Sequence, residues 1–357
     1  MEVVPFLRDL SETAGVSGYE EGMRELVIRQ FGQFADEVRT DKLGNVIALK
    51  RGDTRSPHPC IMLAGHMDEI GLMVTQLKEG FLHFTSVGGI DPRVLLGQEV
   101  IVHGRRDLRG IIGMRPPHVL SQAEREKPRP MEELFVDVGL PQEEVAQLVR
   151  VGDVVTIYRR FMELRNGWVA GKGFDDRAAV AAIAFCLSEL ARMRHQWNVY
   201  GVATVQEEVG LRGAITSTYH IMPEVGIAID VGFGLIPGQP EGKSIKMDKG
   251  PAIAFGPNIH PQVHKGLVEA AQALEIPHQI EPIPGRTGTD AWAMQVTQEG
   301  VPTGLISIPL RYMHTSVETM VIRDIERTGR LLAGFISRLD GAFERALHEQ
   351  PQMGKAM

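Results

Sequence analysis

The sequence predicts an α/β fold interrupted by a β-rich insertion, and two observations support this prediction. Apolar runs of strand length alternate with helical patterns at both ends of the 357-residue chain. Between residues 71 and 165, short β-rich runs are instead separated by Gly and Pro, at a spacing of about 8–12 residues that is typical of a small barrel or sandwich. We therefore expect one discontinuous domain over residues 1–70 and 166–357, and an inserted domain over 71–165.

Length and composition exclude several classes of protein. Hydrophobic residues make up 43% and charged residues 23% of the chain, proportions that fit a folded globular protein of about two domains. A net charge of −7 leaves no basic surface for nucleic acid. No apolar run approaches the ~18 residues that span a membrane, and no signal peptide is visible at the N-terminus.

The two cysteines indicate whether the protein is expected in a reducing or an oxidising compartment. Cys60 and Cys186 each lie in an apolar run. One disulfide is arithmetically possible, but two buried free thiols in a reducing compartment are the expected state. The sequence therefore predicts a cytoplasmic protein.

In the first part of the α/β region, the sequence predicts one helix and two strands. Residues 20–31 place their apolar side chains on one helical face. Residues 45–50 are typical of a short strand. Residues 59–64 form an uninterrupted apolar run of strand length, which predicts a strand covered on both faces.

Helices and strands alternate again after the insertion. The clearest helix covers residues 176–193, where an Ala-rich segment begins with an Asp that complements the helix dipole. The other predicted elements are strands at 199–205, 225–229 and 303–308, and helices at 262–274, 289–299 and 324–347. The last eight residues, 350–357, are expected to fray.

Acidic and imidazole side chains stand near the ends of the predicted strands and at the start of the Ala-rich helix. There are seven of them: His66, Asp68, Asp175, Glu207, Glu208, Asp230 and His314. In open α/β sheets, sites form beyond the carboxyl ends of the strands. We therefore expect these side chains to converge although they are far apart in the sequence.

The residue types suit a metal site. Imidazoles and carboxylates without thiolates match Zn²⁺, Co²⁺ or Mn²⁺. One carboxylate shared by two ions would create a two-metal centre, with the ions about 3.5–4 Å apart. The adjacent Glu207 and Glu208 can divide the roles of general base and ligand. Asp68, two residues beyond His66, can orient that imidazole.

Each motif alone also has an ordinary structural explanation. Asp175 and Asp176 suit the start of a helix, and a pair of glutamates is usually solvated surface. The placement of all the motifs at one sheet edge favours a site. His260 and His264 have the spacing of a helical zinc pair, but no Glu follows His260 and Pro261 places His260 outside the helix, so we expect no catalytic role for them.

Six segments, taken together and in order, resemble the tetrahedral (TET) aminopeptidases, a family of co-catalytic metallopeptidases. The family includes glutamyl, leucyl and deblocking aminopeptidases, and some members are labelled endoglucanases. The segments are AGHMDEIG, GKGFDDR, QEEVG, AIDVG, GTDA and PLRYMHTSVE. The likeness includes the insertion, where GMRPPHVL and LFVDVG are similar to the family's dimerisation domain. It implies a mixed-sheet, helix-sandwiched metallopeptidase domain with an inserted barrel or PDZ-like domain.

The resemblance implies a role for each motif residue. The implied metal ligands are His66, Asp175, Glu208, Asp230 and His314. Asp175 would bridge the two ions, and in relatives this residue precedes an unusual cis peptide. Glu207 would be the general base, and Asp68 would orient the first imidazole. Gly288, Thr289 and Asp290 would line the substrate cleft.

The implied activity is metal-dependent removal of N-terminal residues from peptides, with two divalent ions, of which oxygen and nitrogen ligands favour Zn²⁺ or Co²⁺. Relatives form dimers through the insertion and then tetrahedral dodecamers with internal sites, which implies peptides as substrates.

The alternatives to an aminopeptidase are a dinuclear amidohydrolase or deacylase, the endoglucanase of some labels, and a catalytically inactive assembly protein. No carboxylate pair for glycosidic cleavage is identifiable. Arg286 and Arg311 are the candidates for a preference for acidic side chains, with exposed or ion-paired arginines as the simpler explanation.

Overall fold

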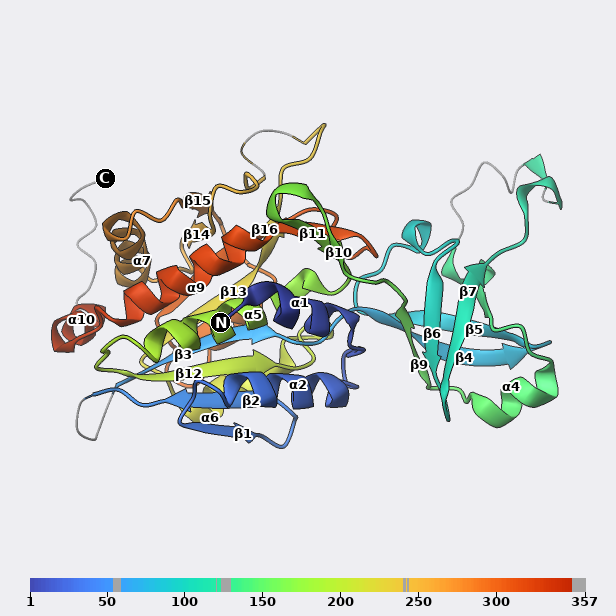
Figure 1. Cartoon of the computed structure of the whole chain (residues 1–357), viewed down its shortest axis with the longest axis horizontal. Helices are drawn as coiled ribbons and strands as arrows, with labels where there is room; N and C mark the ends of the chain where they lie inside the picture. Colours follow the sequence, from blue (N-terminus) through green and yellow to red (C-terminus); the bar gives the residue numbers. More distant parts are fainter. Residues whose placement is uncertain (54–58, 120, 123–129, 240–241, 243, 349–357) are drawn as a thin grey trace.

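The protein consists of a large lobe built on one sheet and a smaller barrel beside it (Figure 1). The computed structural model describes residues 1–53, 59–119, 121–122, 130–239, 242 and 244–348. The predicted α/β fold with a β-rich insertion is confirmed. The exact boundaries between the two predicted domains stay a prediction, although all six barrel strands lie between Gly71 and Ile157.

The large sheet is mixed, with parallel strands at its centre. In order, its eight strands are β1 (Glu37–Thr40), β2 (Val46–Lys50), β12 (Asn198–Thr204), β3 (Cys60–His66), β13 (Val225–Phe233), β16 (Thr303–Leu310), β14 (Ala252–Phe255) and β15 (Gln279–Pro282). Strands β12, β3, β13 and β16 run parallel. Their carboxyl ends therefore meet at one edge of the sheet. Every residue of β3 is buried, as its apolar run predicts.

Helices cover both faces of this sheet. One face packs against α1 (Val3–Glu12), α2 (Glu21–Phe31), α5 (Phe174–Leu190), α7 (Pro261–Ala273) and α9 (Ile322–Ile336); the other packs against α6 (Arg212–Ile221) and α8 (Asp290–Gln295). Helix α5 is buried along almost its whole length. Its small side chains let α9 approach closely, and a Cβ at Gly329 would lie 2.8 Å from the Ala182 carbonyl oxygen. This packing buries the helix whose first turn carries Asp175.

Two further observations concern the cysteines and the possibility of a membrane-spanning helix. Cys60 and Cys186 are both buried and both free, in agreement with the expected thiols. Among the described residues, no helix combines the length and the apolar character that crossing a membrane requires.

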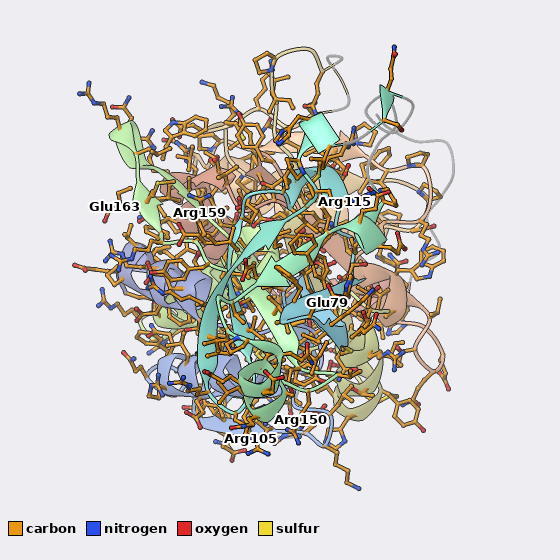
Figure 2. All side chains as sticks on the ribbon, turned by 90° about the vertical axis from the view of Figure 1, so that its right-hand side faces the viewer. Glu79, Arg105, Arg115, Arg150, Arg159 and Glu163 are labelled. Atoms are coloured by element: carbon orange, nitrogen blue, oxygen red, sulfur yellow. The ribbon has the colours of Figure 1, made fainter. Side chains whose placement is uncertain are left out.

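The smaller lobe is a closed antiparallel barrel with its own core. Its strands, in order, are β4 (Gly71–Lys78), β5 (Phe81–Val87), β8 (Phe135–Asp137), β7 (Asp107–Gly113), β6 (Glu99–His103) and β9 (Val154–Ile157). Short helical segments, η1 (Pro92–Val94), η2 (Pro117–Val119), η3 (Met131–Glu133) and α4 (Gln142–Leu148), lie between the strands. Figure 2 faces this lobe, with Arg105 and Arg150 at one end and Arg115 toward the other.

A small three-stranded sheet is separate from the large sheet and from the barrel. It consists of β10 (Met162–Glu163), β11 (Trp168–Gly171) and β17 (Glu318–Val321), with η4 (Arg165–Gly167) between the first two strands. The pairing is antiparallel and places Gly171 opposite Glu318. Because β11 leads into α5 and β17 follows the loop after β16, this sheet brings two distant loops together.

The structure corrects three predicted elements. The predicted helix over 324–347 is wrong, because α9 ends at Ile336 and a separate helix α10 spans Gly341–Leu347. The Asp340 carboxylate accepts hydrogen bonds from two backbone N–H groups at 2.9 Å, which starts the new helix. Helix α8 is shorter than predicted, and β13 continues to Phe233, so Asp230 lies inside the strand. The expected fraying of residues 350–357 lies outside the described residues.

Candidate metal centre

The seven predicted side chains come from the carboxyl edge of the large sheet and from the loops beside it. His66 is the last residue of β3, and Asp230 lies in β13. The Glu207–Glu208 pair follows β12, and His314 lies between β16 and β17. Asp175 comes from the first turn of α5. The convergence expected from the strand ends is therefore present in the fold.

Three of these residues form a first cluster of ligand atoms. His66 Nε2 lies 3.2 Å from Asp175 Oδ1. Asp230 joins them, and each of the three residues offers one ligand atom within 4.8 Å of the others. All three side chains are buried.

A second cluster contains Asp175 again. His314 Nε2 lies 3.1 Å from Asp175 Oδ2 and 3.2 Å from Glu208 Oε1. The ligand atoms of these three residues also lie within 4.8 Å of one another. The two oxygens of Asp175 thus face two different imidazoles, which is the arrangement expected of a carboxylate shared by two ions.

The charges of the site fit divalent cations. Four carboxylates share this small volume with two imidazoles. Burial raises the pKa of Glu207 to about 10, and burial together with the Asp175 carboxylate raises the pKa of Glu208 and of Asp230. Buried carboxylates are destabilised without a compensating positive charge. Oxygen and nitrogen donors in this number suit transition-metal dications.

Glu207 lies beside the clusters but belongs to neither. Its Oε2 is 3.8 Å from His66 Nε2. Its side chain is almost fully buried at 9% exposure. A carboxylate in this position can exchange a proton with a group held at the two clusters.

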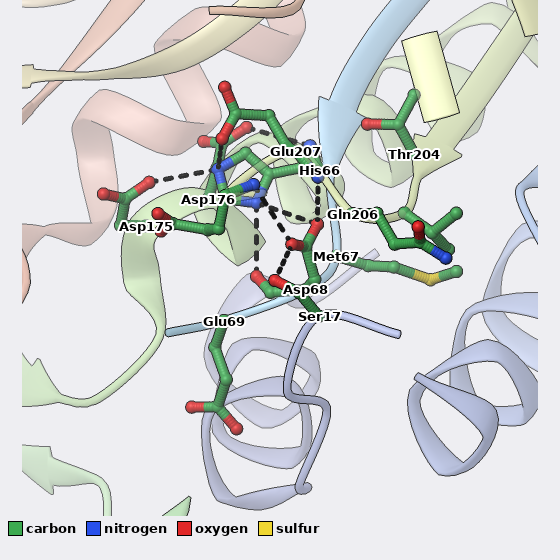
Figure 3. Close-up of polar contacts among 12 residues, drawn as sticks. Ser17, His66, Met67, Asp68, Glu69, Asp175, Asp176, Thr204, Gln206 and Glu207 are labelled. Carbon is green, nitrogen blue, oxygen red and sulfur yellow. Dashed lines mark hydrogen bonds and ion pairs between the residues drawn. The ribbon is translucent and has the colours of Figure 1, made fainter. Parts of the chain in front are cut away.

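Asp68 connects the end of β3 to the turn that carries Glu207 and Glu208 (Figure 3). Its Oδ1 accepts the Glu207 N–H at 3.0 Å, and its Oδ2 accepts the Glu208 N–H at 3.3 Å. The Ser17 hydroxyl donates to the same Oδ2 at 2.5 Å. His66 Nδ1 lies 3.2 Å from the Asp68 carbonyl oxygen and 3.5 Å from its carboxylate. Asp68 thus contacts both the imidazole of His66 and the backbone of the glutamate turn, and its role in orienting them stays a prediction.

The sequence did not single out two buried acids that hold ligand backbones. Asp176 follows Asp175 across a cis peptide bond, and its Oδ2 accepts the His66 N–H at 3.2 Å. Glu318 accepts hydrogen bonds from the N–H groups of Asp175 and His314. Asp176 suits the start of the Ala-rich helix, and Glu318 does not follow an apolar run at a sheet edge, so no local pattern gave either acid a role at the site.

A buried ion triad lies next to the centre. Lys172 Nζ contacts both carboxylate oxygens of Glu69, at 2.8 and 2.7 Å, and Arg177 Nη2 lies 3.0 Å from Oε1. Arg177 also donates to the carbonyl oxygens of Leu10 and Thr13 at 2.7 and 2.8 Å. The two cations lower the pKa of Glu69 against the effect of burial. In Figure 3, Glu69 points away from the imidazole. The triad ties the N-terminal segment to the start of α5.

Substituting Glu69 with Gln is expected to lower the free energy of unfolding by about 3–5 kcal/mol, because two buried cations lose their counter-charge. Denaturant unfolding of the purified protein measures the loss. Glu269→Gln is the control, because its pair with Lys265 is exposed and 3.8 Å apart and should contribute less than about 1 kcal/mol. Equal stability of the two variants would contradict the assigned role of the triad.

The predicted substrate loop lies at the start of α8. Gly288 is exposed and Thr289 is half-buried, whereas Asp290 is buried. The Thr204 hydroxyl at the end of β12 donates to Asp290 Oδ2 at 2.6 Å. The role of these three residues in binding substrate stays a prediction.

The two arginines considered for substrate preference are both engaged by aromatic rings. The guanidinium of Arg286 lies 5.6 Å from the Trp292 ring centre, and that of Arg311 lies 4.8 Å from the Trp168 ring centre. Arg311 Nε also donates to the Leu235 carbonyl oxygen at 2.7 Å. These contacts favour the simpler, structural explanation of both arginines.

The His260–His264 pair lies apart from both ligand clusters. His264 Nδ1 is 2.9 Å from the Ala254 carbonyl oxygen, and its ring packs on Phe255. His260 immediately precedes α7, as Pro261 predicts. Neither imidazole belongs to the ligand clusters found among the described residues.

A turn of the barrel closes one side of the centre. A Cβ at Gly89 would lie 3.2 Å from His314 Nδ1, and a Cβ at Gly88 would lie 3.3 Å from Glu208 Cβ. Gly88 has a φ of +78°, which favours glycine. The smaller lobe thus lies so close to two of the candidate ligands that a side chain at either glycine would crowd them.

Comparisons with known proteins identify a family and solved structures with the same overall fold. A family model described as M42 glutamyl aminopeptidase matches residues 44–331. Lysyl aminopeptidase of Pyrococcus furiosus is 39% identical over 340 residues, covering 93% of this chain and 96% of that protein. The structure of aminopeptidase APDkam598 from Desulfurococcus kamchatkensis is 37% identical, covers 98% of both chains and has a TM-score of 0.91. The TET1 peptidase of Pyrococcus horikoshii, which can assemble into a tetrahedron or a large octahedral shell, is 33% identical with a TM-score of 0.83, covering 95% of this chain and 100% of that chain.

Proposed function

The chain belongs to the M42 family of glutamyl aminopeptidases, and from this premise we propose that it is a dinuclear metallo-aminopeptidase, a hydrolase that removes N-terminal residues from peptides. The observation that carries the proposal is the pair of ligand clusters joined through Asp175. Glu207 supports it further, because its carboxylate lies beside the clusters without belonging to either.

The proposed ligands divide into two sets. His66 and Asp230 would hold one ion, Glu208 and His314 the other, and Asp175 both. Zinc and cobalt are the proposed metals, because both accept mixed nitrogen and oxygen ligands. Divalent ions bound there would polarise the scissile carbonyl and lower the pKa of a water molecule.

Glu207 is the proposed general base. Its carboxylate would take a proton from the attacking water and return that proton to the leaving amine. Asp68 would position this base through the hydrogen bonds to the Glu207 and Glu208 backbone. The aligned, buried position of these groups limits the reorganisation that proton transfer needs.

We also propose that the chain self-associates through the barrel-containing segment, residues 71–165, into dimers and then a tetrahedral dodecamer. The assembly of the similar TET1 peptidase supports this proposal. Internal active sites would admit peptides and exclude folded proteins. Light scattering at working concentration should give a mass near twelve subunits, and a monomeric mass would contradict the assembly.

The buried free thiols support a cytoplasmic location.

A panel of aminoacyl-p-nitroanilides tests the activity. The metal-free protein should be inactive, and Zn²⁺, Co²⁺ or Mn²⁺ added back should restore cleavage and rank the substrates. Carboxymethylcellulose and N-acyl amino acids belong in the same panel. Cleavage of these compounds without cleavage of the p-nitroanilides would assign the site to an endoglucanase or a deacylase. Two bound ions without any turnover would indicate an inactive assembly protein.

A further inference from the structure

We propose that Glu318 is a positioning residue of the second ligand cluster, because its buried carboxylate holds the backbones of Asp175 and His314 together. The inference takes the metal centre of the proposed function as its site. It goes beyond the ligands and the base, since Glu318 offers no atom to either cluster.

The carboxylate bridges two segments that are far apart in the sequence. Its Oε2 accepts the Asp175 N–H at 3.2 Å, and its Oε1 accepts the His314 N–H at 3.0 Å. Glu318 itself is only 2% exposed. The side chains of the two residues that it holds meet at 3.1 Å. One side chain therefore fixes the distance between the two backbones on which this contact depends.

The small sheet explains how Glu318 reaches both segments. Glu318 is the first residue of β17 and lies opposite Gly171, the last residue of β11. The chain runs from Gly171 directly toward Asp175, while His314 precedes Glu318 by four residues. Because β17 pairs with β11, the Glu318 carboxylate lies between the segment that carries Asp175 and the loop that carries His314.

The conformation of His314 needs external support. Its φ is +60°, in the left-handed region that non-glycine residues rarely adopt. Tyr312 in the same loop also has a φ of +60°. Backbone hydrogen bonds between Arg311 and Thr319, at 2.9 and 3.0 Å, close the base of the loop. The bond from Glu318 to the His314 N–H holds the strained residue within it.

Only a carboxylate of this length satisfies both N–H groups. An ionised glutamate has two acceptor oxygens and no donor, whereas glutamine replaces one acceptor with an NH₂ group. Glu318→Gln would therefore leave one backbone N–H facing a donor, and an unsatisfied buried group is destabilising. Aspartate keeps both acceptors but is one methylene shorter.

The chain contains a matched control. The buried Asp324 in α9 also bridges two backbone N–H groups, accepting from Asp248 at 2.8 Å and from Gly250 at 2.9 Å. It belongs to neither ligand cluster. Asp324→Asn breaks the same kind of bridge, together with a 2.9 Å ion pair to Arg327, without touching a proposed ligand. It therefore separates a loss of stability from a loss of ligand positioning.

The experiment is an equilibrium titration of the metal-free full-length protein with Co²⁺, followed by visible absorption, alongside thermal unfolding of each variant. Glu318→Gln should weaken the binding of one of the two ions about 10–100-fold, the usual effect of losing a group that orients ligands. Asp324→Asn should lower the unfolding temperature but bind both ions as the unsubstituted protein does.

Unchanged Co²⁺ binding in Glu318→Gln, or an equal loss in Asp324→Asn, would overturn the proposal. If Glu318→Gln does not fold, Glu318→Asp serves instead, and unchanged binding in that variant would also overturn it. Because the readout is metal binding, a protein that binds two ions but cleaves no peptide would refute the proposed activity without affecting this inference.

Discussion

Glu207→Gln is expected to lower kcat by about 10²–10⁴-fold, the usual contribution of a general base, while the metal content stays unchanged. Glutamine keeps the shape of the side chain but cannot accept the proton from water. Glu207 offers no atom to the clusters formed by the other acids and the two imidazoles, so its loss should leave the ions in place. Aminoacyl-p-nitroanilide kinetics and elemental analysis of the same samples measure the two quantities.

The neighbouring glutamate provides the contrast for this experiment. Glu208 belongs to the second cluster, with Oε1 3.2 Å from His314 Nε2. Glu208→Gln should therefore lose metal as well as activity, and excess Co²⁺ should recover part of that activity. Activity in Glu207→Gln close to that of the unsubstituted protein would remove its role as base.

Asp175→Asn is expected to remove both ions and reduce turnover to background. Asp175 is the only residue found in both clusters of the described chain, and its two oxygens face different imidazoles at 3.2 and 3.1 Å. Asparagine presents one oxygen and one NH₂ group, so one of the two clusters would lose a ligand oxygen. Elemental analysis after dialysis measures the metal content per chain.

An aspartate on the barrel is the matched control. Asp107 Oδ1 lies 2.9 Å from His103 Nδ1, so it also pairs with an imidazole, but it belongs to neither ligand cluster. Asp107→Asn should retain the full metal content and turnover. Two ions bound by Asp175→Asn with the affinity of the unsubstituted protein would contradict the shared role of Asp175.

A simple physical rule led from the sequence to the candidate ligands, whose role at a metal stays a prediction. The central strands are continuous apolar runs, and an acid or imidazole at the end of such a run marks the sheet edge. His66 and Glu207 follow this pattern directly. Asp230 follows it less closely, since β13 continues past it to Phe233. Asp230 still lies in the first cluster, because it is a polar residue that interrupts a buried strand.

Other features could not be predicted from local patterns. Strand β14 has four residues, which are too few to show the alternation of buried and exposed side chains that marks a strand. Strand β5 pairs with β8, which is far from it in the sequence. The apolar pattern of residues 324–347 continues across the break between α9 and α10, which depends on the cap at Asp340. Glu318 acts through backbone contacts with two loops, and no spacing in the sequence reveals such contacts.

The turn at Gly88 and Gly89 has a consequence for how the chain can be divided. The turn approaches His314 and Glu208 so closely that a Cβ at either glycine would lie within 3.2–3.3 Å of them, so the two lobes meet beside the candidate metal centre. A chain shortened by removing residues 71–165 would lose that wall and expose both side chains to bulk water. If the proposed activity holds, we expect a fragment without the insertion to be impaired, because two candidate ligands would lose this neighbouring turn.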